Sequence, residues 1–292
     1  MKGDGYVLSN MKTVDFVDAN YPHATVDEHG NWQAEDEPHY TPPIGPREPH
    51  QTAIAFSSDQ SYFPGLMPAL LSVIKHHPTV PIIVIDDGLS PAQVQYLRQY
   101  CEVFPSRNPL RDFPSWSCLD ISFLEYDRVV YLDSDTITLR PLPALLDAEA
   151  EFLAVRNIDW TIKENFYDPS ILDSYGIGSD VTAFNAGVFS IDNTIWGKGR
   201  LYNEAQKLYE KVGSSFIYPD QSVLHILMNT PERRVTFIEN QYNVIAECWN
   251  WYQPLEGMRL IHYAGNEIKP WNPLCRYPKL DLFFAYSKIR RP

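Results

Sequence analysis

Blocks of apolar residues alternate along the chain with amphipathic stretches, and their order predicts strands separated by helices. After Thr52 the residues up to Phe56 are all apolar, which predicts a buried strand. A helix is expected to begin at Pro64, because the apolar residues that follow recur at helical spacing up to the His-His-Pro stop at 76–78. Residues 81–85 predict a second buried strand, which the turn residues Asp-Asp-Gly end.

The alternation continues through the rest of the chain. Ser90 is expected to cap a helix that has Pro91 in its first turn. Further helices are expected over residues 115–124, 194–212 and 220–228. Further strands are expected at residues 101–104, 128–132, 152–155, 188–191, 235–238 and 259–263. This order predicts an α/β fold whose mostly parallel sheet is flanked by helices.

Residues 1–50 differ in pattern from the remainder. They sustain no helical or strand periodicity, they are rich in Pro and polar residues, and they hold four of the eight histidines at irregular spacing. Such a segment cannot bury enough apolar surface to order itself alone. We therefore expect a polar, Pro-rich N-terminal extension over residues 1–50 and a single domain over residues 51–292.

Charge and composition limit the partners. With 24 Lys and Arg against 37 Asp and Glu, the net charge is −13, which disfavours nucleic acid and anionic membranes. A nucleoside diphosphate would therefore need a cation in its site. No apolar run approaches the roughly 18 residues of a transmembrane segment. The four cysteines are scattered without a C-x-x-C pair, which predicts free thiols and a cytoplasmic protein.

The strongest local signal for chemistry is Tyr-Leu-Asp-Ser-Asp at residues 131–135. Here Asp133 and Asp135 leave the end of an apolar strand, where open α/β sheets bind their ligands. In an extended segment their side chains point the same way, so both carboxylates can meet one Mg²⁺ or Mn²⁺ ion. A turn or capping pair after a strand would look the same.

A second signal follows the last predicted strand. His262 stands at the strand end and offers an imidazole nitrogen to the same ion, although a buried histidine with a structural partner is the alternative. Gly265 permits close approach of the backbone to a phosphate, and Lys269 supplies a positive charge for it.

A third signal consists of Phe-Asn-Ala-Gly-Val at residues 184–188 and Pro-Asp-Gln-Ser at residues 219–222. The amide of Asn185 suits a hydroxyl-rich ligand. Asp220 and Gln221 stand at the start of a predicted helix, where an ordinary N-cap is the alternative for Asp220.

Taken in order, these motifs resemble glycosyltransferase family 8. The resemblance also includes Ser-Ser-Asp-x-x-Tyr at residues 57–62 and His-Tyr-Ala-Gly-x-x-x-Lys-Pro-Trp at residues 262–271, and it covers roughly residues 52–272. It implies a Rossmann-like GT-A fold, a UDP-sugar donor, Mn²⁺ or Mg²⁺ as cofactor, and transfer of a hexose, glucose or galactose, with retention of anomeric configuration.

The resemblance also implies roles for single residues. The metal ligands would be Asp133, Asp135 and His262, and Asn185, Asp220 and Gln221 would face the transferred sugar and the reacting centre. The donor would be held by Ser57, Ser58, Asp59, Tyr62, Asp133, Ser134, Asp135, Gly265 and Lys269.

In one place the sequence departs from the family pattern. Relatives carry Lys or Arg some 15–17 residues before the first Asp of the D-x-D, whereas this chain has Trp116-Ser-Cys118 in that window. Arg107 or Arg111 could substitute from the preceding loop. The departure puts donor choice or catalytic rate in doubt.

Two alternative functions stay open at this stage. The missing basic residue fits a nucleotide-sugar-binding protein without turnover, and an Asp-based phosphohydrolase is a second, poorer fit because two βα units precede the D-x-D. The acceptor is not defined by these motifs: it could be a glycan, a lipid-linked or a small-molecule hydroxyl compound. Its contacts are expected in residues 160–178 and 249–256, and a homodimer is compatible with the sequence.

Overall fold

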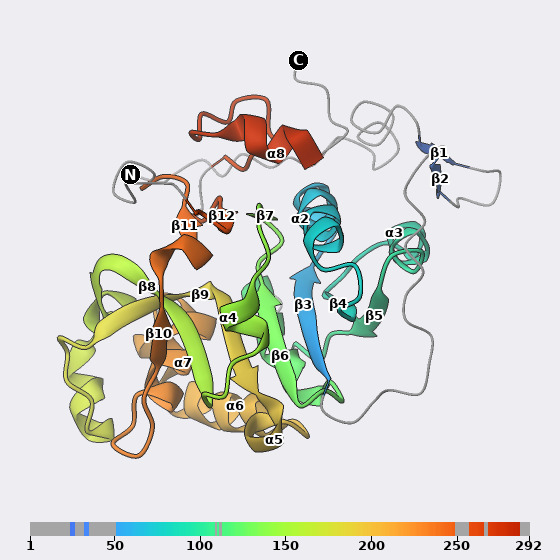
Figure 1. The fold of residues 1–292 in the computed structure, drawn as a ribbon. Helices are drawn as coiled ribbons and strands as arrows, with labels where there is room; N and C mark the ends of the chain where they lie inside the picture. Colours follow the sequence, from blue (N-terminus) through green and yellow to red (C-terminus); the bar gives the residue numbers. More distant parts are fainter. Residues whose placement is uncertain are drawn as a thin grey trace.

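A mixed seven-stranded sheet organises the molecule (Figure 1). The computed structural model describes residues 24–26, 32–34, 51–108, 110, 113–248, 257–265 and 268–286. In this part of the chain the sheet has the order β10-β8-β9-β6-β3-β4-β5. The strands are β3 (Thr52–Ser58), β4 (Ile82–Asp86), β5 (Glu102–Pro105), β6 (Arg128–Leu132), β8 (Phe152–Thr161), β9 (Thr182–Asp192) and β10 (Thr236–Ile238).

Parallel pairing dominates this sheet, as the alternation of strands and helices predicts. Strands β6, β3, β4 and β5 are parallel neighbours, and β10 is parallel to β8. Strand β9 is the exception, because it runs antiparallel to both β6 and β8. The carboxyl ends of β3 and β6 therefore lie side by side next to the middle of β9, and these three strands supply the site described below.

Helices cover both faces of the sheet. Buried residues of α2 (Phe63–His76), α3 (Pro91–Leu97) and α4 (Pro143–Leu146) pack with one set of strand side chains, which includes Ile54 and Phe56. The alternate set, which includes Ala53 and Ala55, packs against η1 (Pro114–Phe123), α6 (Arg200–Val212) and α7 (Pro219–Met228). Because successive strand residues point to opposite faces, the continuous apolar runs of the sequence fill both layers.

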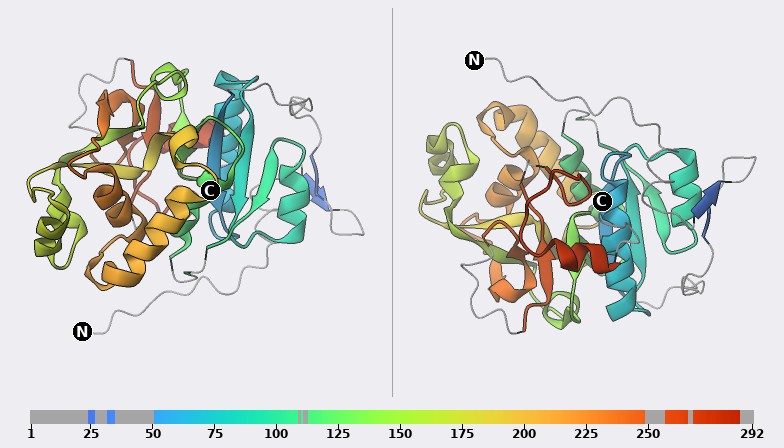
Figure 2. Two further views of the ribbon diagram at one scale, coloured as in Figure 1. Left: turned by 90° about the horizontal axis from the view of Figure 1, so that it is seen from below. Right: turned by 90° about the horizontal axis from the view of Figure 1, so that it is seen from above.

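A small second sheet, in the order β11-β12-β7, completes the site. Its strands are β7 (Thr136–Thr138), β11 (Val244–Ile245) and β12 (Leu260–His262). Strand β7 follows the D-x-D directly and pairs antiparallel with β12, which sets His262 opposite Thr136. Helix α8 (Leu280–Tyr286) packs on this sheet through Phe283 and lies beside α2 (Figures 1 and 2). The short elements that remain are α5 (Asn193–Trp196), η2 (Ile162–Asn165), η3 (Pro169–Tyr175), η4 (Gly213–Ser215) and η5 (Asn240–Tyr242).

Two of the predicted helices occur in a different form. The helix predicted over residues 115–124 is the 3₁₀ helix η1 (Pro114–Phe123), in which the hydroxyls of Ser117 and Ser122 donate to the carbonyls three residues before them, Pro114 and Leu119. Such bonds compete with α-helical ones. The helix expected over residues 194–212 is broken between α5 and α6, where Lys198 and Gly199 adopt φ of 58° and 76°. This left-handed pair cannot continue a helix.

The predicted strands all occur, with changed lengths. Strands β8 and β9 extend well beyond the expected 152–155 and 188–191, and β7 and β11 were not predicted because two or three residues carry no measurable periodicity. The helix cap expected at Ser90 is confirmed, since Ser90 Oγ accepts from Gln93 N at 3.2 Å.

Within residues 1–50 the structure describes a short antiparallel hairpin of β1 (Ala24–Val26) and β2 (Trp32–Ala34), which lies beside α3 (Figure 2). The division at residue 50 stays a prediction. All four cysteines are free, as expected from their spacing. Among the described residues no helix combines the length and the apolar character needed to cross a bilayer.

Candidate active site

A cleft of about 780 Å³ opens at the carboxyl ends of β3 and β6. Every residue for which the sequence predicted a metal, donor or sugar role lines it, although these residues are up to 212 positions apart (Ser57 to Lys269). The lining set that was predicted is Ser57, Ser58, Asp59, Tyr62, Asp133, Ser134, Asp135, Asn185, Asp220, Gln221, His262, Gly265 and Lys269. The topology explains this convergence, because parallel strands deliver the segments that follow them to one edge of the sheet.

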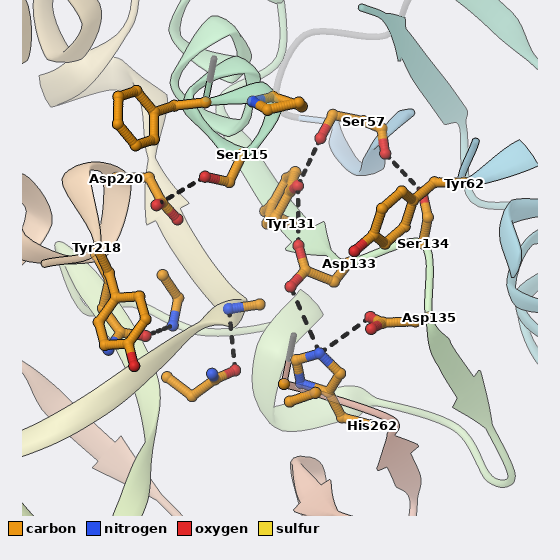
Figure 3. A pocket seen from close by; sticks show the side chains of 18 of the residues that line it. Ser57, Tyr62, Ser115, Tyr131, Asp133, Ser134, Asp135, Tyr218, Asp220 and His262 are labelled. Atoms are coloured by element: carbon orange, nitrogen blue, oxygen red, sulfur yellow. Dashed lines mark hydrogen bonds and ion pairs between the residues drawn. The ribbon is translucent and has the colours of Figure 1, made fainter. Parts of the chain in front are cut away.

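Three of these side chains meet at the centre of the cleft (Figure 3). His262 Nε2 lies 3.4 Å from Asp133 Oδ2 and 3.1 Å from Asp135 Oδ1. One ligand atom from each residue lies within 4.8 Å of the others. Asp135 and His262 are buried, whereas the Asp133 side chain is 37% exposed toward the cleft.

The orientation of the His262 ring is held from behind. Its Nδ1 donates to Asn243 Oδ1 at 3.1 Å, which leaves Nε2 directed at the two carboxylates. The amide nitrogen of Asn243 donates in turn to Asn185 Oδ1 at 3.2 Å. A carboxamide behind the ring fixes the tautomer that presents Nε2 as a ligand.

Gly187 on β9 leaves the space that this cluster occupies. Its carbonyl accepts from Asp133 N at 2.8 Å, so the two backbones are in direct contact. A Cβ at residue 187 would overlap both Asp133 Oδ2 and His262 Cε1. The glycine of the Phe-Asn-Ala-Gly-Val motif is therefore required by the close approach of β9 to the D-x-D.

Lys269 neutralises part of this negative charge. Its Nζ lies 2.6 Å from Asp135 Oδ2 and donates to the carbonyls of Tyr263, at 3.1 Å, and Gly265. Burial opposes the charge on Lys269, but the Asp135 carboxylate outweighs it and raises the pKa of the ammonium group. Gly265 adopts φ of 107°, a conformation that favours glycine, and this turn presents its carbonyl to Lys269.

Burial and charge oppose each other at the two buried members of the cluster. Burial acts to raise the pKa of Asp135, yet Lys269 and His262 together hold it well below its usual range. Burial likewise acts to lower the pKa of His262, but Asp135 and Asp133 raise it to about 9. Asp135 is thus held in its ionised form, and positive charge is favoured between the two aspartates, where the imidazole of His262 lies.

The chemistry of this donor set fits a divalent ion. Two carboxylates and an imidazole whose second nitrogen is held by an amide suit Mn²⁺, and oxygen-rich sites also take Mg²⁺. Asp133, Asp135 and His262 would hold the ion. The Gly187 cradle and the Asn243 amide are features that such a site needs and that a simple capping pair would not.

A second network ties the D-x-D to β3 (Figure 3). Tyr131 OH donates to Asp133 Oδ1 at 3.1 Å and lies 2.7 Å from Ser57 Oγ. Ser134 Oγ donates to the carbonyl of Ser57 at 2.6 Å. The Asp59 carboxylate accepts from the backbone N–H groups of Ser61 and Tyr62 and so shapes the turn that opens α2.

Asp220 and Gln221 lie at the start of α7, across the cleft from Ser57. Burial raises the pKa of Asp220 to about 6, although Ser115 Oγ donates to its Oδ1 at 2.8 Å. Both ends of the Gln221 amide are hydrogen-bonded: its oxygen accepts from Ala186 N at 2.9 Å and its nitrogen donates to Asn165 Oδ1. Gln221 is therefore held rigidly beside Asn185 and Ala186.

The structure shows which residues occupy the place of the basic residue that was expected near Cys118. Trp116 and Cys118 are buried, and Ser115 and Ser117 line the cleft in that place. The guanidinium of Arg107 stacks on the Phe123 ring at 3.8 Å and does not line the cleft. Arg111 lies outside the described residues. Among the described lining residues Lys269 and His262 are the basic ones.

Fold and site together define a class: an α/β fold of GT-A type with a carboxylate–imidazole cluster at its strand ends. The sequence matches the family model Glycosyl transferase family 8 over residues 117–275, and the chain belongs to that family.

Curated relatives and solved structures agree with this family. The chain is 24% identical to glycosyltransferase GlyE of Streptococcus pneumoniae over 80% of its length, and 26% identical to lipopolysaccharide 1,2-glucosyltransferase of Escherichia coli over 55%. It spans 60% and 48%, respectively, of the length of these relatives.

Two crystal structures share the fold. One is the galactosyltransferase LgtC in complex with donor and acceptor sugar analogs, with a TM-score of 0.63 and 20% identity over 80% of this chain and 94% of that one. The other is the apo form of GlyE, with a TM-score of 0.62 and 22% identity over 83% of this chain and 61% of that one.

Sequence reasoning missed three residues that build the site. Asn243 orients His262, Tyr131 connects Ser57 to Asp133, and Ser115 bonds to Asp220. Tyr131 stands within the D-x-D motif, so the motif could have drawn attention to it. Asn243 and Ser115 carry no local signal, because their roles exist only through contacts with residues 19 and 105 positions away.

Proposed function

We propose that this protein is a metal-dependent, retaining hexosyltransferase that moves glucose or galactose from a UDP-sugar to a hydroxyl acceptor. The single observation that supports it best is the cluster of Asp133, Asp135 and His262 in a cleft of about 780 Å³. Membership of the family and the relatives' names, a glucosyltransferase and a galactosyltransferase among them, support transfer of a hexose.

The nucleotide side of the cleft is the end of β3. Here Ser57, Ser58, Asp59 and Tyr62 would hold the uridine, and Lys269 would contact the diphosphate from the opposite strand end. A bound Mn²⁺ or Mg²⁺ would supply positive charge that offsets the charge developing on the departing UDP. The ammonium group of Lys269 would help to offset the same developing charge.

The sugar side of the cleft is formed by Asn185, Asp220 and Gln221. In the proposed reaction the bond between the anomeric carbon and the UDP oxygen breaks as the acceptor oxygen bonds to that carbon from the same face. The acceptor proton passes to the leaving phosphate oxygen, so no strong base is demanded. Asp220 and the fixed amide of Gln221 would stabilise positive charge on the opposite face.

One observation favours a second candidate, a nucleotide-sugar-binding protein without turnover. No arginine is present among the described residues that line the cleft, and Lys269 already pairs with Asp135. Both candidates predict metal-dependent binding of UDP, so turnover separates them. Nothing in the structure favours the phosphohydrolase alternative, and a cytoplasmic location stays an expectation.

The test is UDP release from UDP-glucose and UDP-galactose with Mn²⁺, with and without EDTA, in wild type and Asp133→Asn. We expect turnover that EDTA abolishes and that the variant loses by about 100-fold, as when a transition-state charge stabiliser is removed. Metal-dependent UDP binding without turnover would support the binding protein. Full activity in EDTA would refute the metal site. Retention is checked by the anomeric configuration of the product in its NMR spectrum.

A further inference from the structure

Four exposed aromatic residues surround one part of the cleft, and we call them the aromatic rim: Phe113, Trp160, Tyr167 and Tyr218. Their side chains are 38%, 37%, 73% and 36% exposed, and all four line the cleft. Within the described part of residues 51–286, these are all the aromatic residues with such exposure. Large apolar side chains are normally buried, so their collection at one opening indicates a surface kept for a ligand.

The rim is built from separate elements that converge. Phe113 precedes η1, Trp160 lies near the end of β8, Tyr167 follows η2, and Tyr218 precedes α7. The rings of Trp160 and Tyr218 have centroids 6.5 Å apart and are inclined by 38°. The two rings are therefore neighbours, and both line the cleft.

The polar groups of the rim are free to bind. Among the described residues, the hydroxyls of Tyr167 and Tyr218, the indole N–H of Trp160 and the amide of Asn157 make no hydrogen bond. Asn157 lies on β8 three residues before Trp160 and also lines the cleft. The surface therefore offers apolar ring faces together with unpaired donors and acceptors.

This combination selects one class of ligand. A pyranose ring has an apolar C–H face, which stacks on an aromatic plane, and hydroxyls at its edge, which need donors and acceptors. An alkyl chain would leave the polar groups unpaired, at a cost in binding free energy. An acidic peptide would be repelled by Asp220 and Glu247, which line the same cleft.

We propose that the aromatic rim is the acceptor subsite and that the acceptor is a carbohydrate whose sugar ring stacks at Trp160 and Tyr218. The proposal rests on the hexosyltransferase function proposed above. Figure 3 shows Tyr218 on the side of the cleft opposite Tyr62, with Asp133 between them. A ring at Tyr218 would therefore approach the metal cluster from the side away from the uridine residues.

The experiment is calorimetric titration with lactose, maltose and cellobiose, each in the presence of UDP and Mn²⁺. An octyl alcohol and a Ser/Thr peptide serve as competing acceptor classes. We expect saturable binding of at least one disaccharide, weakened about tenfold in Trp160→Ala and much less in Trp160→Phe, which keeps an aromatic plane. The matched control is Ile195→Ala, which removes an equally exposed apolar side chain, 37% exposed, that does not line the cleft.

Binding of the alcohol or the peptide alone, no binding of any disaccharide, or equal affinity in Trp160→Ala and wild type would overturn the proposal. Thermal stabilisation by UDP with Mn²⁺, measured on the same samples, reports on the donor side. If that stabilisation is absent, the proposed function fails as a whole. If it is present and the disaccharides do not bind, only the acceptor subsite fails.

Discussion

At the scale of single residues, His262 shows how a histidine that is ambiguous in sequence becomes defined by its surroundings. Its Nε2 faces two carboxylates, and its Nδ1 is held by Asn243. A buried structural histidine would need one acceptor and one donor, whereas Nε2 here faces two carboxylates. The arrangement of these four residues resembles a metal ligand with an orienting group behind it.

We predict that Asn243→Ala raises the Mn²⁺ concentration needed for half-saturation by roughly 10- to 100-fold, because the His262 ring loses its orienting hydrogen bond. The measurement is a Mn²⁺ titration by calorimetry, without nucleotide. Asn229→Ala is the matched control, since Asn229 donates to the carbonyl of His225 and does not line the cleft. Equal Mn²⁺ affinity in Asn243→Ala and wild type would contradict the prediction.

At the scale of elements, the site depends on how closely β9 approaches the end of β6. We predict that Gly187→Ala folds but loses roughly 100-fold in turnover, because the added Cβ displaces Asp133 and His262 from their positions. In Gly178→Ala the nearest atom to the new Cβ is Val181 Cγ2 at 3.9 Å, an ordinary contact, so that variant should retain its turnover. Turnover assays beside circular dichroism of both variants provide the comparison.

Helix α7 carries a pH-dependent element of the fold. Burial lowers the pKa of His225 to about 3, and its ring packs 4.0 Å from the Phe184 ring. The unfolded chain therefore binds a proton below about pH 6.5 that the folded chain does not take up until about pH 3. The contribution of neutral His225 to folding stability is therefore fully present above about pH 6.5 and decreases as the pH falls below that value.

We predict that lowering the pH from 7 to 4.5 decreases the free energy of unfolding of both proteins, and that the decrease is about 2 to 3 kcal/mol larger in wild type than in His225→Leu. Urea unfolding of both proteins at the two pH values measures this difference. The comparison cancels other titrating groups, such as Asp220, because they are common to both proteins. Equal losses in the two proteins would show that His225 is not buried in its neutral form.

At the scale of the whole molecule, the cleft shares the acidic balance of the chain. Its described lining carries six carboxylates against Lys269 and His262. The carboxylates belong to Asp59, Asp87, Asp133, Asp135, Asp220 and Glu247. A diphosphate entering this field is repelled unless a divalent ion is bound there as well.

We predict that EDTA weakens UDP binding by more than about tenfold and leaves uridine binding nearly unchanged, because uridine carries no phosphate charge. Calorimetric titrations of both ligands, with Mn²⁺ and with EDTA, test this. Loss of both ligands in EDTA would mean that the ion orders the whole cleft. Loss of neither would mean that the diphosphate does not approach the cluster.

The sequence alone determined the class of fold and predicted thirteen of the residues that line the candidate site. Continuous apolar strands, their spacing by helices, and five motifs in order were enough, because strand ends of an α/β sheet gather at one edge. Local signals also located the helix cap at Ser90 and, to within one residue, the start of α2 at Pro64. These features depend on residues close together in the chain.

Only the tertiary structure decided what holds the site together. Strand β9 runs antiparallel and brings Gly187 against Asp133, the small sheet of β7, β11 and β12 carries His262 to the D-x-D, and Arg107 turns away to stack on Phe123. The convergence of Trp160 and Tyr218 belongs with these features. Each depends on packing between segments distant in the chain, and local pattern carries no information on such contacts.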